Sequence, residues 1–251
     1  MPIILAGGLG SRLSSVLADR PKPLAPVAGR PFVTYLLQQL ADAGFTETVL
    51  ATGHLGELFP EFLGTTFGPL ELVYSRESTP LGTGGGVRLA LASLPEIYSW
   101  FLVLNGDSLV DVELAGFLAW AQTAVPKMAA KLVVVRVCRA DRYGTVRLDG
   151  AQRILDFQEK LTGIGSAWIN AGVYLFSRKH LERWRPNQPF SLERDCLPWL
   201  AAGGQLYGWQ VEVPFIDIGL PETYRRATAF LQGKKDERFG ASGKINERDR
   251  A

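Results

Sequence analysis

The first half of the chain alternates short apolar runs with segments that have helix signals. The apolar runs span residues 3–6, 48–52, 70–74 and 100–104. Helix signals, such as proline at a first turn and glycine after a last one, mark residues 31–43, 57–63 and 87–94. Apolar runs without polar alternation are typical of strands buried on both faces. The order strand, helix, strand therefore predicts a three-layer α/β fold with a mostly parallel central sheet.

The second half has shorter strand-like segments that follow one another closely. After a helix at 112–124, the strand-like segments span residues 131–137, 144–148, 153–158, 167–176, 205–212 and 215–217. Asp149-Gly150 separates two of them and predicts a hairpin turn. A serine N-cap at Ser191 predicts a helix, and Pro221 begins a final helix that runs to Leu231. This half is expected to extend the sheet with mixed or antiparallel strands.

Composition excludes several classes of protein. The 251 residues are 47% hydrophobic and 21% charged, which is typical of a soluble domain with a full core. The net charge is +2, and it disappears when residues 234–251 are set aside, so nucleic acid and anionic membranes are not expected partners. No apolar run is long enough to span a bilayer, and a cytoplasmic location is expected. Cys138 and Cys196 are expected to be reduced thiols of the core.

A glycine-rich loop follows the first apolar run. Gly7, Gly8 and Gly10 allow positive φ and let backbone N–H groups approach an anion closely. Arg12 follows the loop, and Lys22 stands between two prolines that stiffen its approach. The pattern indicates a phosphate site, although a tight strand-to-helix turn with two surface cations remains an alternative. Dinucleotide-binding and P-loop motifs both require residues that are absent after Gly10.

Further candidate residues follow two other segments of the chain. Residues 82–86 contain four glycines around Thr83, which favours close approach of a flat ligand or a phosphate over a flexible linker. Asn105-Gly106-Asp107 ends a buried strand, at the edge where open α/β sheets bind ligands. A carboxylate there suits Mg²⁺ shared with substrate phosphates. Asp111 is a second candidate for that ligand, while His54 and His180 are expected to be structural or exposed.

The motifs together resemble those of the sugar-1-phosphate nucleotidyltransferases, with a Rossmann-like fold. The resemblance is carried by residues 5–13 and 21–27, Leu81–Gly85, Asn105–Asp107, Tyr143-Gly144, 157–160, 169–174 and 215–224. It implies a nucleotide-binding half at about 1–137 and a sugar-binding half at about 138–232 in one domain, 1–232. The polar tail, 233–251, is expected to pack poorly.

The resemblance also implies a role for each candidate residue. Catalysis is assigned to Arg12, Lys22 and Asp107, and the metal, Mg²⁺, to Asp107 and Asp217. Nucleotide binding is assigned to Leu5, Ala6, Gly7, Gly8, Gly10, Gly82, Thr83, Asn105 and Gly106. Sugar-phosphate binding is assigned to Tyr143, Gly144, Glu159, Lys160, Asn170 and Gly172. The substrates would be a nucleoside triphosphate and a sugar 1-phosphate.

Within this family, three motifs look most like those of D-glycero-D-manno-heptose 1-phosphate guanylyltransferases, which make GDP-heptose for surface polysaccharides. These motifs are Leu81–Gly85, residues 190–195 and residues 215–224. GTP is therefore the expected nucleotide. Mannose-1-phosphate guanylyltransferases, and uridylyl- or thymidylyltransferases acting on other sugar 1-phosphates, are the alternatives. A nucleotide-sugar glycosyltransferase or a non-catalytic nucleotide-binding regulator represents a different class. The sequence does not determine the oligomeric state, and a homodimer is possible.

Overall fold

Strand β1 (Pro2–Ala6) lies in the interior of the sheet, as its apolar sequence predicts. The computed structural model describes residues 1–8, 10, 13, 17, 19–123, 128–158, 165–185 and 188–235, the last three as backbone alone. In it β1 pairs in parallel with β4 (Glu47–Thr52) on one side and β7 (Trp100–Asn105) on the other. Ile3 and Ile4 point to opposite faces of the sheet, and both are fully buried. Burial on both faces is the reason that this strand has no polar alternation.

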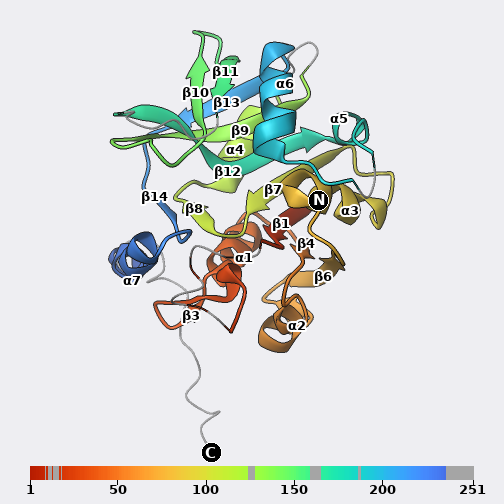
Figure 1. Cartoon of the computed structure of the whole chain (residues 1–251), viewed down its shortest axis with the longest axis vertical. Helices are drawn as coiled ribbons and strands as arrows, with labels where there is room; N and C mark the ends of the chain where they lie inside the picture. Colours follow the sequence, from red (N-terminus) through yellow and green to blue (C-terminus); the bar gives the residue numbers. More distant parts are fainter. Residues whose placement is uncertain are drawn as a thin grey trace, which may run out of the picture.

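The sheet continues without interruption from the first half of the chain into the second. From one edge its path runs β5, β6, β4, β1, β7, β12, β10, β11, and β9 joins β12 to β13. The other strands are β5 (Thr66–Phe67), β6 (Leu70–Arg76), β9 (Ala130–Val137), β10 (Thr145–Leu148), β11 (Ile154–Gln158), β12 (Ala167–Ser177) and β13 (Leu206–Val211). The four strands β6, β4, β1 and β7 are parallel, whereas β12 is antiparallel to β7, β9 and β10. The predicted hairpin and the predicted antiparallel extension are both confirmed (Figure 1).

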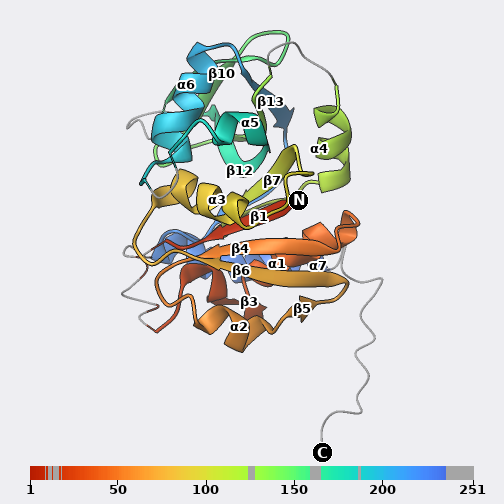
Figure 2. The same cartoon turned by 90° about the vertical axis from the view of Figure 1, so that its right-hand side faces the viewer.

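Helices cover both faces of the sheet, as an α/β sandwich requires. Those packed on the core side that contains Ile4 are α1 (Val33–Asp42), α2 (Leu58–Leu63), α4 (Leu114–Ala121) and α7 (Pro221–Lys235). Those packed on the side that contains Ile3 are α3 (Gly82–Ala92), α5 (Arg178–Leu181) and α6 (Leu197–Ala202). Figure 2 shows α3 and α2 on opposite sides of the strands. The predicted three-layer arrangement is therefore confirmed.

Phe190 accounts for part of the glycine run in α3. A Cβ on Gly84 would lie 2.1 to 2.6 Å from three carbons of the Phe190 ring, and the Phe190 carbonyl accepts the backbone N–H of Gly84 at 3.0 Å. The ring is held in turn against Trp184, with ring centroids 4.6 Å apart and planes 6° apart. Gly84 therefore serves packing within the protein. The interpretation of the whole run as a ligand contact is too broad, although Gly82 and Gly86 do line the cleft described below.

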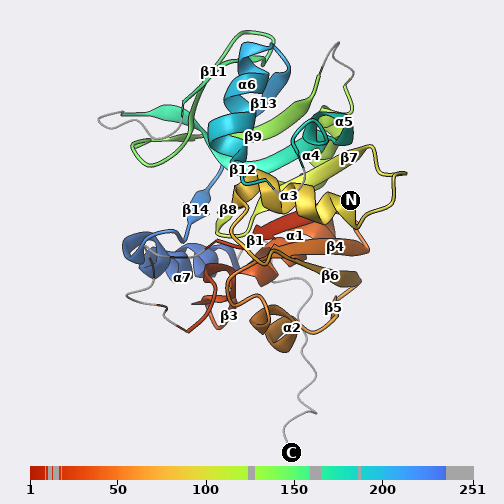
Figure 3. The same cartoon turned by 45° about the vertical axis from the view of Figure 1, so that its right-hand side comes forward.

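Two short strands bring residues 215–217 to the carboxyl end of β7. Strand β14 (Phe215–Asp217) lies beside β8 (Ser108–Val110) (Figure 3). The two strands pair antiparallel, with Asp217 opposite Ser108. The sequence analysis predicted β14 but not β8. It also missed β2 (Pro26–Val27), β3 (Arg30–Pro31), β5, α5 and the helical turn η1 (Lys22–Leu24). Elements this short have no periodic pattern to detect. The helical turn η2 (Leu192–Cys196) begins directly after Ser191, whose side chain accepts from the N–H of Arg194, so the predicted N-cap is confirmed.

The two cysteines differ in exposure. Cys196 is buried, as expected, but Cys138 is exposed. The prediction for Cys138 was wrong because β9 ends at Val137, so the thiol lies just past the buried part of the strand.

Replacing Gly84 with alanine tests the packing role of Phe190. The added methyl group has no room against a ring that is stacked on Trp184, so we expect the free energy of unfolding to fall by about 1–3 kcal/mol. Gly116→Ala in α4 is the matched control, because its Cβ would meet Trp209 at an ordinary 3.6 Å. That change should raise stability by about 1 kcal/mol through helix propensity. Urea denaturation measures the free energy of unfolding of both variants. Equal effects of the two changes would contradict the packing role of Gly84 against Phe190.

Candidate active site

The carboxyl ends of β1 and β7 open into one cleft of about 580 Å³. Within the described part of the chain, every candidate residue except Asp111 lines this cleft. From the catalytic set these are Lys22 and Asp107, and from the nucleotide-binding set they are Leu5, Ala6, Gly7, Gly8, Gly10, Gly82, Thr83, Asn105 and Gly106. From the sugar and metal sets they are Tyr143, Gly144, Asn170, Gly172 and Asp217. Arg12, Glu159 and Lys160, and the tail from residue 236, lie outside the described residues, and their roles stay predictions.

Lys22 reaches the cleft from the short helical turn η1, between Pro21 and Pro23. Its methylene stem crosses Gly10, where a Cβ would come within 3.4 Å of the lysine Cγ. The Lys22 Nζ lies 3.6 Å from Asp107 Oδ2, and the lysine side chain is mostly buried. Gly10 has φ +66°, so the loop turn and the passage of Lys22 both favour glycine there. The ammonium group is thus held beside the loop predicted to bind phosphate.

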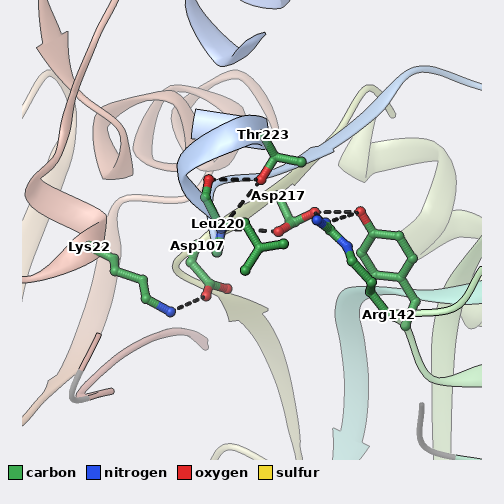
Figure 4. A network of polar contacts seen from close by, with 8 residues as sticks. Lys22, Asp107, Arg142, Asp217, Leu220 and Thr223 are labelled. Atoms are coloured by element: carbon green, nitrogen blue, oxygen red, sulfur yellow. Dashed lines mark hydrogen bonds and ion pairs between the residues drawn. The ribbon is translucent and has the colours of Figure 1, made fainter. Parts of the chain in front are cut away.

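Two aspartates meet where β8 and β14 pair. The backbone N–H of Ile218 donates to the carbonyl of Asp107 at 2.8 Å, which ties the segment after β14 to the segment after β7. Asp107 and Asp217 therefore line the same wall of the cleft, with Lys22 and Arg142 on either side of the pair (Figure 4). Asp111, the second candidate from the sequence, is not among the residues that line the described cleft.

Asp217 has hydrogen-bond donors on both carboxylate oxygens. Gly219 N donates to Oδ1 at 3.0 Å, and Arg142 Nη2 donates to Oδ2 at 2.7 Å. Tyr143 Oη also donates to Oδ2. Burial raises the pKa of Tyr143 to about 12, and its bond to Asp217 acts in the same direction, so the phenol stays a donor throughout the neutral range. Its ring is fixed edge-on against Phe215, with ring centroids 5.5 Å apart.

A second carboxylate network lines the cleft around Glu193. Glu193 Oε2 accepts from Thr83 Oγ1 at 2.7 Å and from Ser191 Oγ at 2.9 Å. Tyr174, which is fully buried, donates to Glu193 Oε1 at 3.4 Å and accepts from Asn170 Nδ2 at 2.7 Å. The Thr83 hydroxyl also accepts from the N–H of Leu192, so its donor is already used within the protein. The assignment of Thr83 to nucleotide binding remains a prediction, and it can act only as an acceptor in this arrangement.

Asn105 and Gly172 pack closely at the boundary between the two halves. Gly172 has φ +76°, and a Cβ there would lie 2.7 Å from Ser108 Oγ and 2.9 Å from Asn105 Cβ. The Asn105 Oδ1 atom is buried, and no donor within the described part of the chain reaches it. Its amide group donates toward Tyr174 Oη at 3.5 Å. The Asn105 Oδ1 atom is therefore a buried acceptor without a donor from the described residues, beside the cleft that Asn105 lines.

Sequence reasoning missed four charged residues of the cleft: Glu77, Arg142, Glu193 and Arg194. Glu77 directly follows β6, so the strand-end argument that found Asp107 applies to it as well. Burial raises the pKa of Glu77, while a hydrogen bond from the N–H of Leu81 lowers it. The other three lie inside or beside motifs whose neighbouring residues were singled out.

The charge of the described lining favours a bound cation. Its carboxylates are Glu77, Asp107, Glu193 and Asp217, and its cationic side chains are Lys22, Arg142 and Arg194. No described part of the chain groups three or more His, Cys, Asp or Glu side chains in a way that could hold a metal alone. Two adjacent aspartates offer hard oxygen ligands, and the remaining ligands must come from water or substrate phosphates. This donor set fits a divalent cation that binds together with a phosphate ligand.

Comparison with known proteins identifies the family. Residues 1–233 match the family model described as nucleotidyl transferase. The chain belongs to the nucleotidyl transferase family. The predicted family and enzyme class are therefore confirmed.

The sequence relatives align with most of the chain. It is 35% identical to D-glycero-alpha-D-manno-heptose 1-phosphate guanylyltransferase of Aneurinibacillus thermoaerophilus, over 92% of this chain and 97% of that enzyme. It is 34% identical to mannose-1-phosphate guanylyltransferase of Mycobacterium tuberculosis, over 91% of this chain and 64% of that enzyme. The crystal structure of HddC from Yersinia pseudotuberculosis matches with a TM-score of 0.77 and 30% identity, over 92% of this chain and 98% of that one. HddC has also been solved with GMP-PN.

Among the described helices, none combines the length and apolar character needed to cross a bilayer.

Tyr174→Phe tests whether the Glu193 network holds the cleft together. Without the hydroxyl, the amide of Asn170 and one oxygen of Glu193 lose their partner in a buried region, so we expect the free energy of unfolding to fall by about 1–3 kcal/mol. Tyr207→Phe is the control, because no hydrogen bond of the Tyr207 hydroxyl is found within the described residues. Chemical denaturation compares the two, and an unchanged Tyr174→Phe protein would show that the network adds no stability.

Proposed function

We propose that this enzyme transfers GMP from GTP to D-glycero-D-manno-heptose 1-phosphate, releasing pyrophosphate and forming GDP-heptose. The observation that carries the proposal is the 35% identity to a heptose 1-phosphate guanylyltransferase, extending over nearly the full length of both chains. The arrangement of the cleft, with a glycine loop and Lys22 on one side and Asn170 and Tyr143 on the other, supports it. The cytoplasm is the proposed location and Mg²⁺ the proposed cation.

The reaction needs charge stabilisation more than it needs a base. A phosphate monoester has a second pKa near 6, so its oxygen is already ionised at neutral pH. That oxygen forms a bond to the α-phosphorus of GTP while the bond from the α-phosphorus to the bridging oxygen breaks, and no proton must move. Pyrophosphate leaves with the negative charge. Catalysis therefore consists of holding the two phosphates in line and stabilising the charge between them.

Lys22 is the described cation best placed for this task. It lies beside the Gly7–Gly10 loop, and the loop would hold the triphosphate through backbone N–H groups. Because the Lys22 stem is buried along Gly10, its ammonium group has little freedom to leave the site. Arg12, outside the described residues, would act on the departing pyrophosphate.

Asp107 and Asp217 would hold the divalent cation. When bound there, the cation would neutralise phosphate charge and orient the two phosphate groups. The position of the cation would be set by the two carboxylates. Their segments are held together by the hydrogen bond from Ile218 N to the Asp107 carbonyl.

The sugar phosphate would occupy the part of the cleft formed by the second half of the chain. Asn170 Nδ2 is committed to Tyr174, and its Oδ1 accepts from the N–H of Gly172. Asn170 therefore shapes this wall more than it supplies free donors. The predicted contacts of Glu159 and Lys160 with sugar hydroxyls and phosphate would add to it.

Glu77 is a candidate for recognition of guanine. It lines the cleft together with Gly82 and Gly86, and one of its oxygens lies against Gly7 and Gly53. Guanine presents N1–H and N2–H₂ side by side, and a carboxylate accepts such a donor pair with both oxygens. Adenine presents an acceptor at N1, and uracil presents a single N–H between two carbonyls. A carboxylate thus favours guanine, and it replaces the backbone groups of the Gly82–Gly86 run as the leading candidate.

Lys22→Ala should lower kcat by on the order of a hundredfold, as the loss of one charge-stabilising donor commonly does. The measurement is pyrophosphate release from GTP and heptose 1-phosphate. Lys179→Ala, an exposed lysine away from the cleft, is the control for loss of one positive charge. A rate equal to that of the control would remove Lys22 from the mechanism.

Glu77→Gln should raise the KM for GTP by roughly 10- to 100-fold, because hydrogen bonds to a charged group contribute about 1.5–3 kcal/mol. It should also narrow the preference for GTP over ATP, since the amide can donate to N1 of adenine. Glu71→Gln, an exposed residue of the same strand, is the matched control. If GTP kinetics do not change, guanine is read elsewhere in the cleft.

A matrix of nucleoside triphosphates against sugar 1-phosphates tests the function as a whole. Mannose 1-phosphate is the second candidate substrate, since a mannose-1-phosphate guanylyltransferase is 34% identical. Turnover of GTP with heptose 1-phosphate in clear preference to mannose 1-phosphate is the expected result. Preference for UTP or dTTP would overturn the guanylyl assignment.

A further inference from the structure

Asp217 and Asp107 are unequal as cation ligands in this structure. Asp217 is 15% exposed, and its two oxygens accept from Gly219, Arg142 and Tyr143. Asp107 is 40% exposed, and its carboxylate faces Lys22 only at the longer distance of 3.6 Å. A cation that approaches the pair finds Asp107 accessible and Asp217 already neutralised by a guanidinium group (Figure 4).

Arg142 and a cation would compete for Asp217 Oδ2. The guanidinium lies 2.7 Å from that oxygen, so a divalent ion there would stand next to a like charge. Tyr143 is a neutral donor, and Gly219 bonds to the other oxygen. Arg142 is therefore the partner whose departure removes the charge repulsion, whereas the N–H of Gly219 can keep the carboxylate oriented after the exchange.

Arg142 is also accessible enough to change its partner. Its side chain is 34% exposed, compared with 15% for Asp217. It lines the same cleft as the residues proposed to bind the phosphates. Guanidinium groups bind phosphate oxygens in a bidentate manner, so a phosphate in the cleft offers Arg142 a partner at least as good as one carboxylate oxygen.

We propose that Arg142 is a substrate phosphate-binding residue, held on Asp217 in the free protein and exchanged for a divalent cation when a phosphate enters the cleft. The exchange leaves every charge paired, since Arg142 moves from carboxylate to phosphate while the cation takes its place on Asp217. Cation and phosphate binding are then coupled through one arginine. The proposal rests on the proposed function for the nature of the phosphate ligand.

Binding of Mn²⁺ to the full-length protein, followed by electron paramagnetic resonance, tests the exchange without any turnover. In the unaltered protein, Mn²⁺ alone should bind weakly, and inorganic phosphate should tighten its binding. In Arg142→Met, Mn²⁺ alone should bind about tenfold more tightly, because the competing charge is gone. The tightening by phosphate should largely disappear in the same variant.

Three further variants make the result specific. Arg139→Met removes an equal charge from an exposed position outside the cleft and should behave as the unaltered protein. Arg142→Lys keeps the charge and should retain part of the coupling. Arg142→Gln repeats the test with a polar side chain if the methionine variant does not fold, as judged by its thermal transition.

The proposal is overturned if loss of Arg142 leaves Mn²⁺ affinity unchanged or weaker, because Arg142 would then merely orient Asp217. It is also overturned if phosphate still tightens Mn²⁺ binding to the same degree in Arg142→Met. Failure of the proposed function would look different: the unaltered protein would release no pyrophosphate from GTP and heptose 1-phosphate, whatever its Mn²⁺ binding.

Discussion

The hydrogen bond from Ile218 N to the carbonyl of Asp107 holds the candidate active site together. It continues the pairing of β8 with β14 and joins the segment after β14 to the carboxyl end of β7. Leu109, Val110 and Ile216 bury the two short strands in the core below, so the connection is anchored by packing as well as by backbone bonds. Without it, the two aspartates would belong to unrelated parts of the surface, and neither alone makes a cation site.

The continuous sheet likewise holds the binding positions of the two substrates at a fixed separation. Since β12 pairs with both β7 and β9, the wall that carries Asn170 is continuous with the strand that ends at Asn105. The close contact of Gly172 with Asn105, and the bonds of both asparagines to the Tyr174 hydroxyl, give this junction little freedom. Two phosphates held on either side of such a junction keep a constant separation, which a reaction governed by positioning requires.

The cleft combines fixed and exchangeable polar groups. Thr83, Ser191 and Tyr174 satisfy Glu193 from within the protein, so that carboxylate is part of the rigid frame. Arg142 is a partly exposed cation on a carboxylate that also suits a metal ion, and it is the group proposed to exchange when a phosphate enters the cleft. Glu77 combines both properties. It is half-buried, accepts from the N–H of Leu81 through one oxygen, and packs closely against Gly7 and Gly53 through the other.

The sequence by itself determined the layers, the central strands and the places where the chain turns into a ligand site. Apolar runs such as residues 3–6 and 100–104 must be buried on both faces, and glycine or aspartate directly after them is a local signal that needs no knowledge of the fold. Only the tertiary structure decided which side chains meet. That Gly84 serves Phe190, that Thr83 is committed to Glu193, and that Arg142 lies on Asp217 are contacts between residues far apart in sequence. Local pattern carries no information on such contacts, because they follow from strand order and the packing of loops at one edge of the sheet.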